Sequence, residues 1–300
     1  MLQGVKGKVS PQTKVTYVKG CDVTGTEEEI QKAKVAAAQA SVALVVLGED
    51  VDTDREGADS ATLELQGRQM DLVKAVYETK TPTIVVLING RPMATPWIAE
   101  NVPGIVEAWN CGEKGGQAVA EVLFGDYNPS GHMAISVPRH AGQLPVYYNR
   151  RPSRALTNRR HARYIEFSSE PLYPFGFGLS YTNFDYTNLR IKPDKPTPGD
   201  KVSVSVDVKN IGSRAGDDVV QLYVRDVVSS TVRPVIELKG FERISLEPGQ
   251  AKKVNFTITP DQLTFVDPDL NRVLEPGTFE VMIGKSSEDI AAKGSFELVR

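Results

Sequence analysis

The sequence predicts an α/β fold with a mostly parallel sheet flanked by helices, followed by an all-β sandwich. In the first half, short apolar runs without alternation are separated by segments of helical periodicity, which is typical of strands buried in a parallel sheet. In the last third, apolar and polar residues alternate and Pro-Gly turns separate the runs, which is typical of half-buried antiparallel strands. We therefore predict two domains, at 1–183 and 184–300, with a long irregular connection at 126–183 that belongs to the first.

Composition and charge narrow the class of protein. With 300 residues, 40% hydrophobic and 24% charged, the chain is neither a disordered tail nor a fibre nor a coiled coil. A formal net charge of -3 gives no reason to expect nucleic acid or an anionic membrane surface as a partner. The longest apolar runs, Val42–Leu47 and Thr83–Ile88, are far shorter than the roughly 20 residues needed to cross a bilayer. We therefore expect no membrane partner. The opening residues 1–13 lack the apolar stretch of a secretory signal, so we expect no such signal in this sequence.

The elements of the first half follow one another as strand, helix and strand. Thr26, with Glu29 three residues later, is a capping signature that indicates the start of a helix. Apolar residues recur at helical spacing in the segment between the two longest apolar runs. In chain order we predict a strand at Lys14–Val18, a helix at Thr26–Ala40, a strand at Val42–Leu47, a helix at Leu65–Thr79, strands at Thr83–Ile88 and Gly104–Trp109, and a helix at Gly115–Phe124.

Periodicity is lost between residues 126 and about 183, where Gly, Pro, Tyr and Arg are frequent. A connection of this length is usually functional or wraps another element. Beyond it, valines occupy every second position from Val202 to Val208, and turn signals such as Pro198-Gly199 and Pro248-Gly249 punctuate the chain. We place the domain boundary near Phe184. We predict strands at Val202–Val208, Val219–Val224, Lys252–Ile258 and Thr278–Ile283.

One loop of the first half concentrates acidic residues directly after a buried strand, where open α/β sheets border their ligand crevices. Its six carboxylates are Glu49, Asp50, Asp52, Asp54, Glu56 and Asp59. The first three aspartates mimic the start of an EF-hand calcium loop, but Arg55 stands where that loop needs Gly and Ala61 where it needs Glu. The calcium reading therefore fails. The alternative to a functional site is that these carboxylates simply form an acidic loop exposed to solvent.

Other chemistries lack their motifs. No glycine-rich dinucleotide or phosphate loop is complete, and no Gly-x-Ser-x-Gly elbow is present. Cys21 and Cys111 lie in no Cys-x-x-Cys pattern, so we expect packed thiols without a disulfide or zinc. We expect no metal and no cofactor. The three histidines lie in the irregular connection, and the arginines near its middle are typical of a surface; these residues are His132, His140, His161, Arg159, Arg160 and Arg163.

Several long sequence motifs in the chain resemble those of glycoside hydrolase family 3, the β-glucosidase and β-xylosidase group. The resemblance covers nearly the whole chain. The uninterrupted motifs LFGDYNPSG and YPFGFGLSYT make it highly specific. The matching motifs are Glu56-Gly57-Ala58-Asp59, VVLINGRP at 85–92, Ala108-Trp109 with GGQA at 115–118, VLFGDYNPSG at 122–131, and LYPFGFGLSYT at 172–182.

The resemblance implies a layout and a catalytic residue. Members of that family typically carry an N-terminal barrel, then an α/β sandwich domain, then often a fibronectin type III-like sandwich, and this chain resembles the second and third parts. The barrel provides the nucleophilic aspartate, and the second domain provides a general acid/base glutamate. The Glu-Gly-x-Asp pattern matches that glutamate to Glu56, with Glu49 as the rival candidate. The carboxylates of Asp54 and Asp59 would favour a protonated Glu56, and Arg55 would oppose it.

The sequence departs from the family pattern in places. Ser60 stands where the family often has Arg, and Gln66 where it often has Pro, so the entry to the following helix differs. The Ser-Asp-Trp setting of the nucleophile is absent, and a barrel of about 250 residues has no room before Met1. The match begins partway into the α/β domain, so we expect its first strand and helix to be missing.

The resemblance therefore predicts the C-terminal portion of a retaining β-glycosidase acting on an oligosaccharide or glycoside, with Glu56 as general acid/base and the nucleophile on a missing barrel domain. We expect the isolated chain to be nearly inactive, because no covalent intermediate forms without the nucleophile. Two alternatives stay open. One is a split glycosidase completed by a separate barrel chain; the other is a non-catalytic carbohydrate-binding or structural module.

Overall fold

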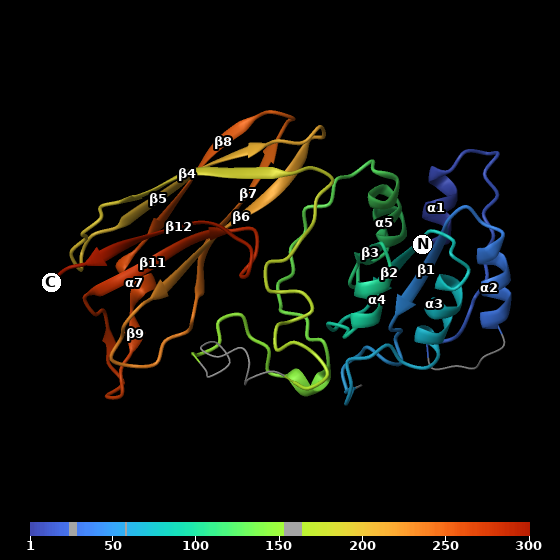
Figure 1. Ribbon diagram of the computed structural model, residues 1–300, viewed down its shortest axis with the longest axis horizontal. Helices are drawn as coiled ribbons and strands as arrows, with labels where there is room; N and C mark the ends of the chain where they lie inside the picture. Colours follow the sequence, from blue (N-terminus) through green and yellow to red (C-terminus); the bar gives the residue numbers. More distant parts are fainter. Residues whose placement is uncertain (24–28, 58, 153–163) are drawn as a thin grey trace. The chain divides into compact units, whose positions relative to one another are not determined.

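The protein is described here by a computed structural model, in which the chain divides into two compact units (Figure 1). The structure describes residues 1–23, 29–57, 59–152 and 164–300. The first unit comprises Met1–Tyr127 and Val137–Leu144, and the second comprises Asn128–Ser136 and Pro145–Arg300. The predicted boundary near Phe184 coincides with the start of the first strand of the second unit, and the limits of the two domains stay a prediction.

The sheet of the first unit is parallel, as predicted. Its three strands lie in the order β1, β2, β3, with Ala43 opposite Thr83 and Ile84 opposite Gly104. The strands are β1 (Ala43–Gly48), β2 (Thr83–Ile88) and β3 (Gly104–Glu107).

Helices surround this sheet. The helix predicted at Gly115–Phe124 is confirmed and ends at Gly125, which has a left-handed φ of 77° and caps it. The helices predicted around α2 and α3 are shorter than expected, and the Thr26 cap lies outside the described residues. Three of the described helical segments of this unit were not predicted: α1, α4 and the 3₁₀ helix η2. The helical segments are α1 (Leu2–Lys8), α2 (Ile30–Ala38), α3 (Gln69–Tyr77), α4 (Pro96–Asn101), α5 (Gly115–Phe124) and the 3₁₀ helix η2 (Ala141–Gln143).

The core of the first unit lies on one face of the sheet, where α2 and α3 pack. Alternate strand residues such as Val45 and Val85 join the apolar side of α3, including Val73, in one buried cluster. On the other face Val86 is buried, whereas Val46 is 42% exposed. The expectation of two covered faces is thus met by β2 but is wrong for β1, because β1 lies at the edge of the sheet.

Two further expectations for the first unit are wrong. Lys14–Val18 forms no strand, and its Tyr17 is 66% exposed, because alternating residues form a strand only beside a partner and β1 pairs with β2 alone in the described sheet. Cys21 packs half-buried against the core, as expected. Cys111 is exposed, because it lies in the tight turn between β3 and α5 where Trp109 and Gly112 both have positive φ.

The second unit is a sandwich of antiparallel sheets, which confirms the predicted all-β fold. One sheet has the order β4-β5-β8 and the other β12-β11-β6-β7. The four valines from Val202 to Val208 on β5 are at most 1% exposed, as their alternation predicts. The strands are β4 (Phe184–Lys192), β5 (Val202–Asn210), β6 (Gly216–Asp226), β7 (Glu237–Leu246), β8 (Ala251–Ile258), β9 (Phe265–Val266), β10 (Arg272–Val273), β11 (Gly277–Gly284) and β12 (Ile290–Leu298), with the short helix α7 (Pro260–Leu263) before β9.

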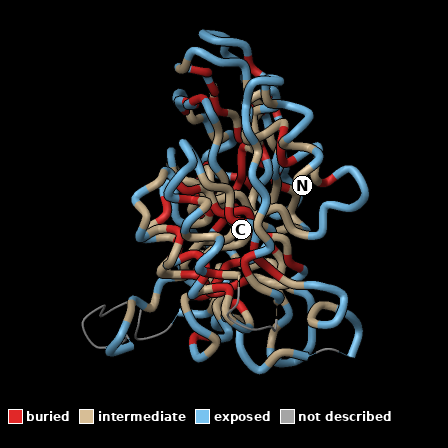
Figure 2. The backbone as a smooth tube through the Cα atoms, turned by 90° about the vertical axis from the view of Figure 1, so that its right-hand side faces the viewer, coloured by how far each residue is buried: buried red, intermediate tan, exposed pale blue. Residues whose placement is uncertain are grey.

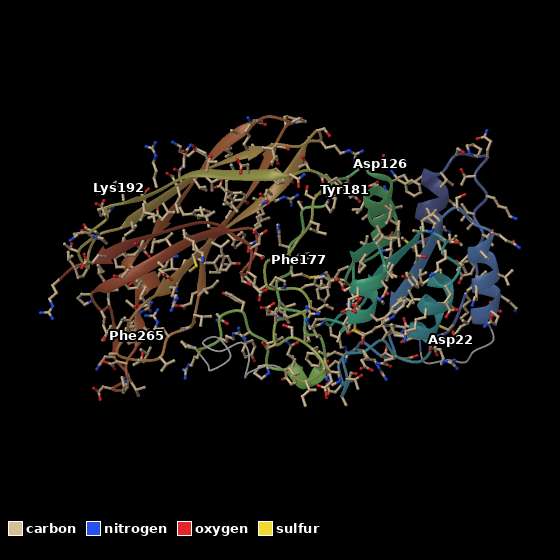
Figure 3. All side chains as sticks on the ribbon, in the orientation of Figure 1. Asp22, Asp126, Phe177, Tyr181, Lys192 and Phe265 are labelled. Atoms are coloured by element: carbon tan, nitrogen blue, oxygen red, sulfur yellow. The ribbon has the colours of Figure 1, made fainter. Side chains whose placement is uncertain are left out.

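Alternate residues of β4, β5, β6 and β11 build the core between the two sheets. Figure 2 colours the chain by burial, with buried stretches in red and exposed turns in pale blue. The side chains of Phe177, Tyr181, Lys192 and Phe265 from this unit are labelled in Figure 3.

Described parts of the irregular connection wrap the second unit. Met133 N–H donates to Phe177 O at 2.8 Å, and Gly176 N–H donates to Met133 O at 2.7 Å, so two distant stretches run side by side. Asn128 ties them to the sandwich, because its Oδ1 accepts from Tyr181 N–H at 2.8 Å and its Nδ2 donates to Ala215 O at 3.0 Å. No helix of the described residues is long and apolar enough to cross a membrane.

Candidate functional site

The carboxyl ends of β1, β2 and β3 meet at one edge of the parallel sheet, and polar side chains follow each strand. Glu49 comes directly after β1, Asn89 after β2, and Glu107 ends β3. In parallel sheets this edge borders the ligand crevice. The acidic loop leaves the same edge, so the sequence placed it correctly.

Arg91 holds the acidic loop to the sheet. Its Nε lies 2.9 Å from Oε1 of Glu49, whose side chain is only 1% exposed. Its Nη2 donates to Thr53 O at 2.6 Å and lies 3.8 Å from Oδ1 of Asp54. One guanidinium thus balances a buried carboxylate and fixes the loop backbone, a task that suits its planar fork of donors.

Two more contacts fix the same loop. Asn110, beyond β3, donates from Nδ2 to Oδ2 of Asp54 at 2.8 Å. A Cβ at Gly90 would lie 2.1 Å from Oδ2 of Asp54, so this aspartate sits directly against the glycine backbone. Within the loop, Oδ1 of Asp50 accepts from the backbone N–H groups of Asp52 and Thr53 at 3.1 and 3.2 Å, which makes a turn. Asp50 and Asp54 are therefore structural.

The structure leaves Glu56 exposed on this anchored loop, followed by Gly57 with a φ of +76°. Ala58 of the Glu-Gly-x-Asp pattern lies outside the described residues. Asp54, which the sequence analysis placed beside Glu56, instead faces Arg91 and Asn110. The rival Glu49 is buried and ion-paired, so its carboxyl is not presented to a ligand.

Glu107 is a titratable group that the sequence reasoning missed. Burial raises its pKa from 4.5 to about 7, while hydrogen bonds from Trp109 N–H, 3.1 Å away, and from the side chain of Asn89 act in the opposite direction. Asn89 in turn donates from Nδ2 to Arg91 O at 2.8 Å, which links Glu107 to the residue that clamps the loop. The sequence did contain a signal for this buried acid, because a glutamate ends the otherwise apolar run GIVE at 104–107.

The possible metal ligands and the basic residues add little to this site. In the part of the chain that the structure describes, no three His, Cys, Asp or Glu side chains are grouped to hold a metal ion. His161 and the nearby Arg159, Arg160 and Arg163 lie outside the described residues. The Lys8 ammonium pairs with Asp126 beyond α5 at 3.0 Å, a structural contact whose aspartate is labelled in Figure 3.

Comparison with known proteins finds matches along most of the chain. The model of the glycosyl hydrolase family 3 C-terminal domain matches residues 1–181, and that of a fibronectin type III-like domain matches residues 218–287. A β-xylosidase of Formosa agariphila is 44% identical over 96% of this chain and 40% of its own length. A periplasmic β-glucosidase of Salmonella typhimurium is 38% identical over 100% of this chain and 42% of its own length.

Solved structures agree. The chain is similar to a β-glucosidase from Erythrobacter marinus, with a TM-score of 0.91, 36% identity, and coverage of 99% of this chain and 43% of that one. It is also similar to a β-glucosidase from Listeria innocua solved in complex with glucose, with a TM-score of 0.88, 35% identity, and coverage of 93% and 39%. This chain therefore spans about two-fifths of the length of these relatives.

Proposed function

This chain belongs to glycoside hydrolase family 3, and from that premise we propose that it supplies the general acid/base Glu56 to a retaining β-glycosidase. The substrate is an oligosaccharide or glycoside with a β-linked glucose or xylose unit. The names of the relatives, which are β-glucosidases and β-xylosidases, support that substrate class.

The observation that carries the proposal is the accessible carboxyl of Glu56 on a loop anchored by Arg91 and Asn110. A general acid must come within hydrogen-bond distance of the leaving-group oxygen, so its carboxyl must be open to the substrate. Glu56 meets this condition and fits the Glu-Gly-x-Asp pattern, whereas Glu49 is buried against Arg91.

The second carboxyl of the reaction lies outside this chain in our proposal. Retaining hydrolysis needs a nucleophilic carboxylate about 5–5.5 Å from the acid/base. We assign it to an aspartate of a barrel domain, because the chain spans only about two-fifths of its relatives. The isolated chain should then turn over no glycoside above background, since no covalent glycosyl intermediate can form.

The test is hydrolysis of aryl β-glucosides and β-xylosides by the purified chain, alone and with a family 3 barrel domain added in trans. We expect turnover only with the barrel. Glu56→Gln should lower the rate about 10²- to 10⁴-fold for a poor leaving group, because general acid catalysis contributes that much. The loss should be smaller for a dinitrophenyl leaving group, which needs little protonation.

A matched control is Asp52→Asn, which removes another exposed carboxylate of the same loop and should leave the rate unchanged. Equal losses in Asp52→Asn and Glu56→Gln would contradict the acid/base role. Robust turnover by the chain alone would contradict the half-site proposal. If a barrel chain encoded beside this one forms a stable complex with it, the split-glycosidase version holds; oligosaccharide binding that survives Glu56→Gln without any turnover would favour the non-catalytic module.

A further inference from the structure

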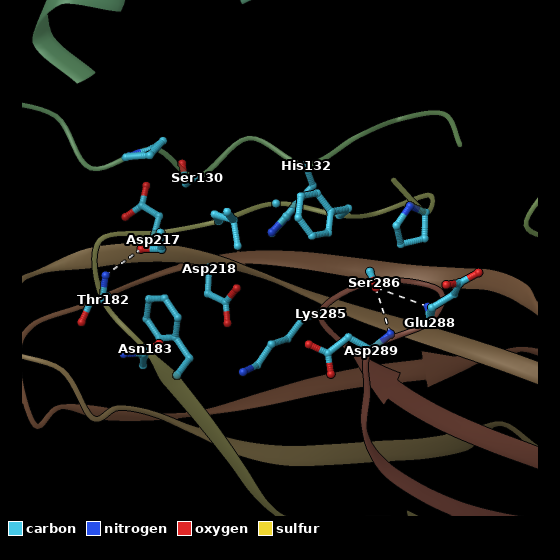
Figure 4. A pocket seen from close by; sticks show the side chains of 17 residues that line it. Ser130, His132, Thr182, Asn183, Asp217, Asp218, Lys285, Ser286, Glu288 and Asp289 are labelled. Carbon is cyan, nitrogen blue, oxygen red and sulfur yellow. Dashed lines mark hydrogen bonds between the residues drawn. The ribbon is translucent and has the colours of Figure 1, made fainter. Parts of the chain in front are cut away.

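The second unit contains a cavity of about 550 Å³, whose lining includes the carboxylates of Asp217 and Asp218 (Figure 4). Both carboxylates already have partners, because Arg243 Nε donates to Asp217 at 2.9 Å and Tyr186 Oη–H donates to Asp218 at 2.6 Å. The imidazole nitrogens of His132, which also lines the cavity, are buried and so closed to a ligand. This lining therefore selects no class of ligand.

In the first unit, the turn that follows β3 has a backbone conformation that needs support from its surroundings. Trp109 has a φ of +50°, in the left-handed region that bulky side chains rarely adopt. The turn is tight, since Cys111 N–H donates to Trp109 O at 3.1 Å and Gly112 also has a positive φ, of 72°. A residue such as Trp109 keeps this conformation only where the contacts around it hold it there.

Glu107, the last residue of β3, supplies such a contact. Its Oε1 accepts from the Trp109 N–H at 3.1 Å. Pairing with β2 continues just past it, because Ala108 N–H donates to Leu87 O at 2.9 Å. The carboxyl of Glu107 therefore lies where the sheet ends and the turn begins, and it satisfies the N–H of the residue with the left-handed backbone.

The turn leads directly to the acidic loop. Asn110, the residue after Trp109, donates from its Nδ2 to Oδ2 of Asp54 at 2.8 Å. The direction of the Asn110 side chain depends on the backbone of the turn, and the contact between Glu107 and Trp109 helps to fix that backbone. One path of contacts thus runs from Glu107 through the turn to Asp54.

A second path reaches the same aspartate from β2. The side chain of Asn89, which is fully buried, forms a hydrogen bond with Glu107 and donates from Nδ2 to Arg91 O at 2.8 Å. Nη2 of Arg91 lies 3.8 Å from Oδ1 of Asp54. Both paths therefore end on the carboxylate of Asp54, two residues before Glu56.

We propose that Glu107 is a positioning residue for the acid/base reaction: an acceptor at this position holds the turn at Trp109, keeps Asp54 in place and so orients the segment that carries Glu56. This role rests on the proposed function of Glu56. Glu107 does not touch the substrate in this role. It needs an acceptor oxygen rather than a negative charge, because the backbone N–H that it binds is a neutral donor.

Two substitutions separate the acceptor from the bulk of the side chain. Glu107→Gln keeps an oxygen for the Trp109 N–H, whereas Glu107→Met keeps a side chain of similar length with only a weak sulfur acceptor. With a family 3 barrel domain in trans, Glu107→Met should lower kcat about tenfold or more with little change in KM, because a misplaced acid impairs the chemical step rather than substrate binding. Glu107→Gln should stay within about threefold of the wild-type kcat. Glu113→Met, on an exposed side chain of the same turn, is the control and should change neither quantity.

A second measurement needs neither the barrel nor turnover. Selective ¹⁵N labelling of tryptophan gives two backbone amide signals, because the sequence contains two tryptophans. The signal of Trp109 should shift in Glu107→Met and remain close to that of the wild type in Glu107→Gln, with Trp97 as the internal reference. The amide of Asp54, which donates to Asp50 O at 2.8 Å, should exchange about fivefold faster in Glu107→Met alone.

If Glu107→Met does not fold, Asn110→Ala interrupts the same path at an exposed residue and should give the same faster exchange at Asp54. Unchanged exchange at Asp54 in the folded variant, or an unchanged kcat in Glu107→Met, would overturn the positioning role. Equal losses of kcat in Glu107→Gln and Glu107→Met would also overturn it, since the charge rather than the acceptor would then matter. The acid/base proposal is tested by a different variant: a Glu56→Gln protein with the wild-type rate would contradict that proposal even where the loop responds to Glu107→Met as expected.

Discussion

At the scale of single residues, Arg91 joins groups that lie far apart in the sequence. It faces the buried Glu49, the backbone of Thr53 and the carboxylate of Asp54. A lysine would keep the charge but not the fork that reaches several acceptors at once. The position and order of the acidic loop therefore depend on this guanidinium.

We predict that Arg91→Lys loosens the loop without unfolding the unit. Amide hydrogen exchange at 50–57 should become faster, while exchange in β2 stays slow. With a barrel domain in trans, kcat should fall about tenfold with little change in KM, because substrate positioning by the barrel is untouched. Arg55→Lys, on an exposed side chain of the same loop, is the control and should change neither quantity. Unaltered exchange in Arg91→Lys would show that the clamp is dispensable.

Glu107 makes stability depend on pH in the direction opposite to most carboxylates. Its pKa is raised by burial to about 7 in the folded chain, against about 4.3 when unfolded. The folded state therefore holds a proton that the unfolded state has lost between these values. The associated stability is complete below about pH 4.3 and is lost as the pH rises from there through about 7, a change of at most about 4 kcal/mol.

The variant Glu107→Gln should remove this dependence, because a carboxamide still accepts from Trp109 N–H but does not ionise. Urea unfolding followed from about pH 5 to about pH 8 should show the wild type losing stability relative to the variant. Glu113→Gln, on an exposed side chain, should leave the pH dependence as it is. A constant difference between wild type and Glu107→Gln across this range would contradict the shifted ionisation.

At the scale of elements, the periodicity of the sequence predicted most strands and helices, and tertiary contacts decided the rest. VALVVL and TIVVLI are apolar enough to require a sheet, and the valines of β5 alternate cleanly. Lys14–Val18 alternates too, yet no strand lies beside it. The long strands β4, β7 and β12 were not predicted. In β7 and β12, Lys239, Lys293 and glycines interrupt the alternation.

The candidate site also has parts that the sequence predicts and parts that depend on tertiary contacts. The prediction for Glu56 came from a short motif of the family resemblance, which is local in sequence and can be recognised without a structure. The clamp by Arg91 could not, because its partners are brought together only when β1 and β2 pair, and the burial that shifts Glu107 is likewise a product of the fold. The contact between two stretches of the connection, from Met133 to Phe177 and Gly176, is likewise one that sequence periodicity does not reveal.

The open edge of β1 carries a prediction of its own. Val46 lies in the middle of this edge strand and is 42% exposed, and apolar edge strands promote pairing with other chains. Val46→Lys should therefore reduce concentration-dependent association in light scattering while leaving the melting temperature nearly unchanged. Val228→Lys adds the same charge at an exposed position of the second unit and should have no such effect. Equal association of the wild type and Val46→Lys would contradict a role of this edge strand in association.

At the scale of the whole molecule, each unit has its own buried core. Val73 lies in the core of the first unit and Val206 in that of the second, both fully buried. We predict two thermal transitions, with Val73→Ala lowering only one and Val206→Ala only the other, each by about 2 kcal/mol. Differential scanning calorimetry of the three proteins checks this, and a single transition displaced by both variants would contradict independent cores.

The chain passes from one unit to the other three times, after Tyr127, Ser136 and Leu144. No single proteolytic cut or stop codon therefore separates the units cleanly. A gene fragment ending at 144 would carry Asn128–Ser136 without its hydrogen bonds to Phe177 and Gly176. To express the first unit alone, 128–136 must be replaced by a short flexible linker, and to express the second alone, 137–144 must be replaced in the same way.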